Sequence, residues 1–180
     1  MKKKYIFRSK YHFSSQQLLI VASAISGVII GLIVVIATIQ AVKTPIVSVG
    51  ETALNTSSAL TVEAVTQTDA RELFSGKIVE KEKGLIIRLQ VENKTDSSQP
   101  FLPVNQVFLK SADGRIYQMR PIAGVKDPIV GGDIKAHATA VGEVSFMVDD
   151  SAQELWLYFD GRWNNDAPLV SALPQVAKTR

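Results

Sequence analysis

The stretch that decides the fold class is Ile86-Ile87-Arg88-Leu89-Gln90-Val91-Glu92, in the middle of a chain of 180 residues. Apolar residues at positions 87, 89 and 91 alternate with polar residues at 88, 90 and 92. Successive side chains of a β-strand point to opposite faces, so this pattern predicts a strand with one buried and one solvated face. Residues 60–64, 143–148 and 155–159 repeat the alternation. The chain is therefore predicted to be rich in β-strands.

The connections between these strands carry turn signals. Residues 107–119 read as strand, turn and strand, with Asp113-Gly114 at the centre, and Asp-Gly supplies the positive φ that a tight hairpin needs. Prolines and a Gly-Gly pair separate the other strands, and between residues 121 and 140 the strand register stays open. Short strands at this spacing, each with one buried face, predict an all-β, antiparallel β-sandwich.

The N-terminal region has a different character. Five cations and no acid occupy the first ten residues, and no charged residue occurs from Tyr11 to Val42. The apolar run at residues 18–39 would rise about 33 Å as a helix, enough for a hydrocarbon core of about 30 Å. The cations favour a cytoplasmic N-terminus. We expect a basic cytoplasmic arm at residues 1–17 and one N-terminal transmembrane α-helix at residues 18–42, in contact with the lipid bilayer.

Two further questions concern this helix. A cleaved signal peptide is the alternative, since Ile39-Gln40-Ala41 is a tolerable cleavage context, but the apolar run is longer than the roughly 7–15 residues of a signal peptide. Under both interpretations the rest of the chain lies outside the cytoplasm. Ser23, Gly27 and Gly31 recur every four residues and form a helix-packing face for a homodimer, although small residues are common in membrane helices.

Charge and cysteine content exclude several classes of function. The chain has a net charge of +3, but the part beyond the arm contains 15 basic residues and all 17 acidic residues. The basic excess thus belongs to the arm, which indicates topology and contact with anionic lipid, not nucleic-acid binding. The chain has no Cys, which excludes disulfides, thiolate zinc sites, iron–sulfur clusters and a lipid-modified Cys. We expect a short linker at residues 43–46, a β-sandwich at 47–163 and a loosely ordered C-terminal tail at 164–180.

The order of motifs from Val47 to Trp163 resembles a known family. The motifs are Val49-Gly50-Glu51-Thr52, the strands at 60–65 and 86–95, the hairpin at 108–117 and the late strand at 142–148. They resemble the bacterial telokin-like, immunoglobulin-like domain of unknown function, which follows a lipobox or a single membrane helix in cell-envelope proteins. The resemblance implies an immunoglobulin-like β-sandwich. The family carries no catalytic residue set, so none is transferred to this chain.

Few residues offer chemistry. His137 could pair with Asp133 and a serine, but a lone His in a β-domain is more often a surface or structural residue. The adjacent acids Asp149-Asp150, with Asp160 or Asp166, could bind Ca²⁺, yet adjacent acids between strands are usually a solvated turn. We therefore expect no enzyme activity, no metal and no cofactor.

Aromatic residues gather near the end of the predicted sandwich, at Trp156, Tyr158 and Trp163. If Leu155 and Leu157 face the core, Trp156 and Tyr158 face outward, where such side chains anchor a protein or glycan partner. The alternative is that another layer, a loop or the tail covers them. The leading hypothesis is a non-enzymatic, single-pass plasma-membrane protein whose outer domain binds an unidentified envelope protein or supports an assembly. The alternative is a sensor or carrier domain for a ligand, glycan or ion.

Overall fold

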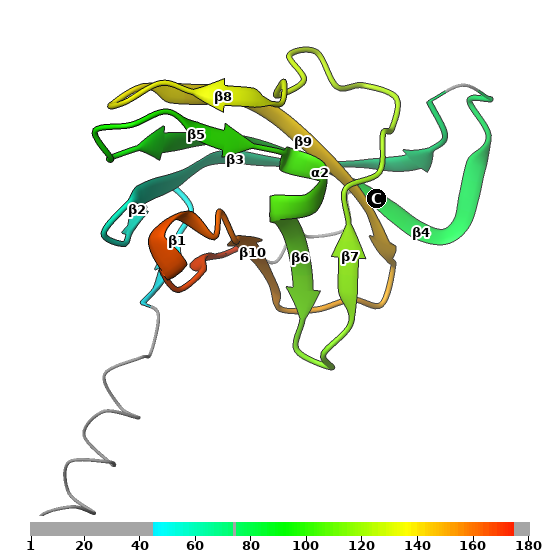
Figure 1. Cartoon of the computed structure of the whole chain (residues 1–180). Helices are drawn as coiled ribbons and strands as arrows, with labels where there is room; N and C mark the ends of the chain where they lie inside the picture. Colours follow the sequence, from blue (N-terminus) through cyan, green and yellow to red (C-terminus); the bar gives the residue numbers. More distant parts are fainter. Residues whose placement is uncertain (1–44, 74, 175–180) are drawn as a thin grey trace, which may run out of the picture. The chain divides into compact units, whose positions relative to one another are not determined.

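The computed structural model describes residues 45–73 and 75–174 (Figure 1). The predicted arm, the predicted transmembrane helix and its Ser23, Gly27 and Gly31 face lie outside these residues. Within the described ranges, no helix is long and apolar enough to cross a membrane.

The described part of the chain is an all-β sandwich with almost no helix, as the alternation predicts. The first sheet has the strand order β1 (Ile46–Ser48), β11 (Leu169–Ala172), β10 (Leu155–Phe159), β6 (Val107–Ser111) and β7 (Ile116–Gln118). The second sheet has the order β2 (Thr52–Leu54), β3 (Ser58–Arg71), β4 (Ile78–Asn93) and β9 (Thr139–Asp149). A two-stranded ribbon pairs β5 (Gln99–Phe101) with β8 (Gly132–Ile134). The helical pieces are α2 (Pro103–Gln106) and the 3₁₀ turn η1 (Trp163–Asn165).

The core lies between the two main sheets. Ile87, Leu89 and Val91 of β4 are fully buried in it, together with Leu109 of β6 and Leu157 of β10. The alternations at residues 86–92 and 155–159 therefore assign the faces of β4 and β10 correctly, because every second residue points into this layer.

The alternation is incomplete in two strands. In β3 a bulge follows Val62, so Ala64 is exposed and Val65 packs on the core instead. In β9 both faces are buried, because Ile122 covers Met147 on the side away from the main core. The bulge depends on how β3 pairs with β4, and the second buried face of β9 depends on a distant loop. Local periodicity therefore reveals neither feature.

The tail expected to be loosely ordered at residues 164–180 contains a strand. β11 pairs antiparallel with β10, and it also pairs parallel with β1, so that Ile46 lies opposite Val170. Leu169 and Ser171 are fully buried in the sandwich. This prediction was therefore wrong for residues 169–172, because the first strand, some 120 residues earlier in the sequence, supplies their second neighbour.

The hairpin predicted at residues 107–119 is present as β6 and β7, and Gly114 in its turn has a φ of +87°. The segment with the open register, residues 121–140, contributes β8 and then runs beside β9. There the Ile129 N–H donates to the Glu143 carbonyl at 3.0 Å. A Cβ at Gly142 would lie only 2.7 Å from the Cα of Ile129, so this crossing requires glycine.

Candidate interaction surfaces

The outward side of the five-stranded sheet forms the first candidate surface. Trp156 and Tyr158 of β10 point away from the core, because Leu155, Leu157 and Phe159 between them are buried. The strand registers place two rows of outward residues across the sheet. One row is Ile46, Val170, Tyr158, Phe108 and Gln118, and the other is Ser48, Ala172, Trp156, Lys110 and Ile116. Val170 is only 4% exposed, so it does not itself offer a contact surface. We call these ten residues the aromatic face.

Apolar contacts dominate the aromatic face. The rings of Phe108 and Tyr158 stack with centroids 5.2 Å apart and planes 5° apart. Ile46 and Ile116, on the two edge strands, are 58% and 57% exposed. Lys110 is the one charged residue among the ten, and none is acidic. The structure thus places two of the three aromatic residues that the sequence singled out, Trp156 and Tyr158, on one partly exposed face.

Trp163 does not belong to this surface, and its prediction as a surface residue was wrong. It is only 4% exposed, and its ring packs edge-on against Phe159 at 5.4 Å. Its Nε1 donates to the carbonyl of Pro100 at 3.0 Å. The chain reverses after β10 through Gly161 and the left-handed Arg162 (φ +52°), which brings Trp163 over the end of the core.

A second surface, which sequence reasoning missed, lies where α2 meets the loop before β8. Leu102, Val104 and Val130 are 53%, 59% and 79% exposed. The two segments touch at Gly131, where a Cβ would come within 3.2 Å of the Pro103 side chain. We call Leu102, Val104 and Val130 the end patch. No local signal reveals it, because its two segments are far apart in the sequence.

The acidic residues considered for Ca²⁺ have protein partners. The carboxylate of Asp149 pairs with Arg115, and it accepts a hydrogen bond from the Tyr117 hydroxyl at 2.9 Å. The hydrogen bonds from Tyr117 and Arg115 lower the pKa of Asp149. Asp166 accepts from the Ser57 N–H at 2.8 Å and from its hydroxyl, and Asp160 pairs with Arg162 at 3.2 Å. Within residues 45–73 and 75–174, no group of three metal-ligating side chains gathers.

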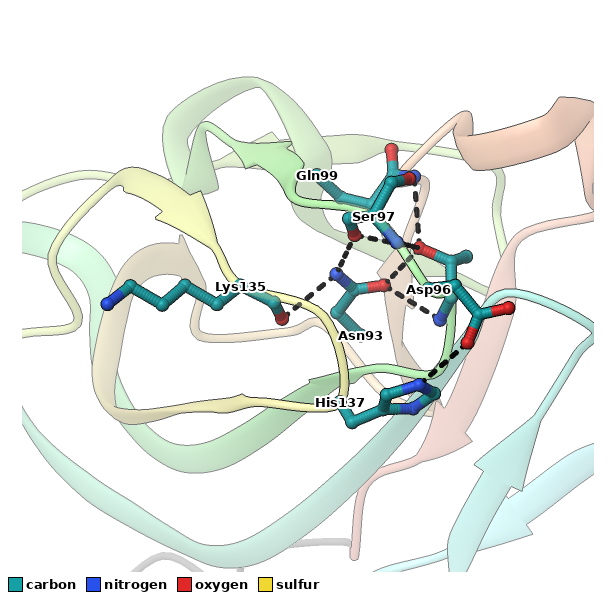
Figure 2. A network of polar contacts seen from close by, with 7 residues as sticks. Asn93, Asp96, Ser97, Gln99, Lys135 and His137 are labelled. Atoms are coloured by element: carbon teal, nitrogen blue, oxygen red, sulfur yellow. Dashed lines mark hydrogen bonds and ion pairs between the residues drawn. The ribbon is translucent and has the colours of Figure 1, made fainter.

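His137 pairs with Asp96 and not with Asp133. Its Nε2 lies 2.9 Å from the Asp96 carboxylate, and both side chains are well exposed (Figure 2). Beside this pair, the fully buried Asn93 holds the loop together: its side-chain amide donates to the carbonyls of Ser97 and Lys135 at 2.7 and 3.0 Å (Figure 2). The pair and the network join the loop after β4 to the loop before β9, so they have a structural role.

The long hairpin of β3 and β4 extends beyond the rest of its sheet (Figure 1). β4 pairs with β9 only from Glu82 onward. Before that, Ile78 pairs with Arg71 of β3, and the Lys81 carbonyl accepts from the Asp150 N–H at 2.9 Å. A shallow hollow of about 360 Å³ lies there, between the hairpin and the turn after β9. Its walls are mixed: they include Gln67, Thr68, Ile78, Lys81 and Asp150.

The fold and these surfaces define a class of protein, a β-sandwich domain that offers exposed faces and end loops. Residues 47–168 match the family described as a domain of unknown function, DUF4352. The chain belongs to this family, which confirms the resemblance drawn from the strand and turn motifs. No curated protein matches the chain.

Solved structures share the fold. The yjhA protein from Bacillus subtilis superposes with a TM-score of 0.60 at 18% identity, over 72% of this chain and all of that one. The secreted protein MPT63 from Mycobacterium tuberculosis gives a TM-score of 0.52 at 16% identity, over 73% of this chain and 98% of that one. A B. subtilis protein described as a "putative lipoprotein (ycdA)" gives 0.59 at 12% identity, over 71% of this chain and 39% of that one. At these identities the likeness establishes the fold alone.

Proposed function

We propose that this protein is a single-pass plasma-membrane protein whose immunoglobulin-like β-sandwich lies outside the cytoplasm and acts by binding an envelope protein, without catalysis. The uncharged apolar run at residues 18–42, behind five cations, supports the anchor and its orientation. The names of two proteins of similar fold, one a secreted protein and one a "putative lipoprotein", also support a place outside the cytoplasm.

The observation that carries the binding role is the end patch. Single exposed apolar residues are ordinary on a protein surface. Here three large apolar side chains, each more than half exposed, come from two segments that contact each other at Gly131. Exposed apolar side chains on a short helix and a loop held by a rigid sheet are candidates for protein interaction.

The experiment is site-specific photocrosslinking of the full chain in cells. A photoreactive residue at Val104 or Val130 is expected to give one discrete crosslinked product. The same residue at Thr66, an exposed position on β3, is the matched control and should not give that product. Val104→Asp combined with Val130→Asp should abolish the product without unfolding the domain, because both side chains are exposed. An identical product at all three positions, or none at the patch, would contradict the binding role.

A second candidate function rests on the hollow beside the β3–β4 hairpin. Its mixture of charged, amide and apolar walls suits a small polar ligand. Binding to the native state at a hundredfold excess over Kd stabilises it by about 2.7 kcal/mol, which raises the melting temperature. A melting shift with Ca²⁺ or cell-wall fragments, lost when Thr68 is replaced by a large residue, would favour this function. If no member of such a panel shifts the melting temperature, ligand binding at this hollow is contradicted, and protein binding is the one function still proposed.

A further inference from the structure

The aromatic face has a composition suited to a membrane–water interface. Trp156 and Tyr158 each combine an apolar ring with a polar group, and Lys110 combines an apolar stem with a cation. Side chains of these types are enriched at the level of the lipid headgroups. None of the ten side chains is acidic, and the carboxylate of Glu51 lies at the edge of the face, where it accepts from the Ser48 N–H at 2.8 Å.

The place of the face in the sequence brings it close to the bilayer. Its first residue, Ile46, follows the predicted transmembrane segment at residues 18–42 by four positions. Four residues of extended chain span at most about 14 Å. β1 carries Ile46 directly into the first row of the face, opposite Val170. A tether this short gives the face a high effective concentration at the membrane surface, so weak contacts suffice to hold it there.

The charge of the face argues against a second copy of the chain as its occupant. None of the ten residues is acidic, so in a face-to-face dimer Lys110 would meet no carboxylate of the face itself.

We propose that the aromatic face lies against the headgroup region of the bilayer that anchors the chain, with Trp156 and Tyr158 at the interface and Lys110 on an anionic lipid phosphate. The proposal rests on the proposed membrane anchor and names the lipid surface as the partner of this face. The end patch remains the surface for a protein partner.

The test uses the native tryptophans of the full chain in vesicles of phosphatidylcholine and phosphatidylglycerol. The chain has two Trp residues, and Trp163 is buried while Trp156 is on the face, so Trp163 serves as an internal reference. Brominated lipids in the vesicles are expected to quench the fluorescence of Trp156. Aqueous acrylamide is expected to quench Trp156 less in vesicles than in detergent. Trp156→Phe should remove the lipid-dependent quenching.

Charge reversal supplies the second arm. Lys110→Glu is expected to lower the ratio of docked to undocked protein by at least about fivefold in vesicles with phosphatidylglycerol. Loss of one cation near an anionic surface costs about that factor, and the new carboxylate adds repulsion. Lys77→Glu, at an exposed position on the β3–β4 hairpin, is the matched control and should leave quenching unchanged. Ile116→Ser, on another strand of the face, should weaken docking independently if the Lys110 variant folds poorly.

The outcomes separate this proposal from the anchor on which it rests. If the chain floats with the vesicles but acrylamide reaches Trp156 as freely as in detergent, the lipid contact is refuted and the anchor stands. The face would then be free for a protein partner. If the chain does not float with the vesicles at all, the anchor is refuted, and the lipid contact fails with it.

Discussion

Replacing Asn93 with alanine is expected to destabilise the β-sandwich by about 4 kcal/mol. Asn93 is fully buried at the end of β4, and its amide donates to the carbonyls of Ser97 at 2.7 Å and of Ile134 and Lys135 at 3.0 Å. Its side-chain oxygen accepts from the N–H and the hydroxyl of Thr95 at 3.0 and 2.8 Å. Figure 2 shows how this side chain holds two loops together.

The magnitude follows from these five contacts. A hydrogen bond inside a protein contributes about 1 kcal/mol net, and a buried group left without a partner costs about 1–3 kcal/mol. Water can replace the two contacts around Thr95, which are the more exposed, so they contribute little to the difference. The three contacts to the Ser97, Ile134 and Lys135 carbonyls account for about 3 kcal/mol, and the buried Ile134 carbonyl, which keeps the Ser98 hydroxyl at 3.4 Å, adds about 1 kcal/mol for its lost amide. The sum is about 4 kcal/mol. With a urea dependence of about 2 kcal/mol per M, the unfolding midpoint should fall by about 2 M.

The assay is urea unfolding of residues 44–180, which form one compact unit, followed by far-ultraviolet circular dichroism, a signal that stays available when either Trp is replaced. Asn105→Ala, at an exposed position in α2, is the matched control and should change stability by less than about 0.5 kcal/mol. A loss below about 1 kcal/mol for Asn93→Ala would refute the view that this side chain fixes the loops.

Three further predictions concern packing and pH. Gly142→Ala should cost about 2–3 kcal/mol in the same urea assay, because the new Cβ would lie 2.7–2.9 Å from atoms of Ile129; a neutral result would contradict that close crossing. Trp163→Phe should cost about 2 kcal/mol, whereas Trp156→Phe should change stability by about 0.5 kcal/mol or less, and equal losses would contradict their different burial. The pKa of Asp149 is lowered in the folded state, so its stabilising contribution is present above the unfolded pKa of about 3.9 and is lost as the pH falls. The gap in melting temperature between the native chain and Asp149→Asn should therefore close below about pH 4, and a gap that widens there would show the sign to be wrong.

Strand identity could be predicted from sequence wherever alternation and turn chemistry are local. The alternation at residues 86–92 lies in β4, and Asp113-Gly114 forms the turn of the β6–β7 hairpin, with Gly114 at φ +87°. In both places the residues that carry the signal also make the structure, because strand faces and tight turns depend on neighbours within a few positions.

Features that depend on distant partners could not be predicted in this way. β11 has four residues and no long alternation, and its second neighbour β1 lies at the other end of the domain. Trp163 follows the outward residues of β10 by a few positions, yet the left-handed turn at Arg162 directs it into the core. For the aromatic face, alternation predicts that Trp156 points outward, but only the order of five strands places Lys110 beside it.

Two of the acids considered for Ca²⁺, Asp149 and Asp166, connect distant segments of the fold. Asp149 joins the β6–β7 hairpin to the end of β9 through Arg115 and Tyr117, and Asp166 joins the C-terminal segment to Ser57. A chain without Cys has no disulfide to hold such loops, so hydrogen bonds between side chains and backbone take that role.

This assignment gives a criterion for interpreting variants of the protein. Substitutions at loop-closing residues such as Asp166 and Asn93 should lower stability and any binding together, because they act on the fold. Substitutions on exposed surfaces, such as Val104→Asp or Lys110→Glu, should change binding at nearly constant stability, because their side chains contribute little to the core. A variant that loses partner or lipid binding while its unfolding midpoint stays fixed therefore locates a functional surface, and under the two proposals we expect such variants on the end patch and the aromatic face.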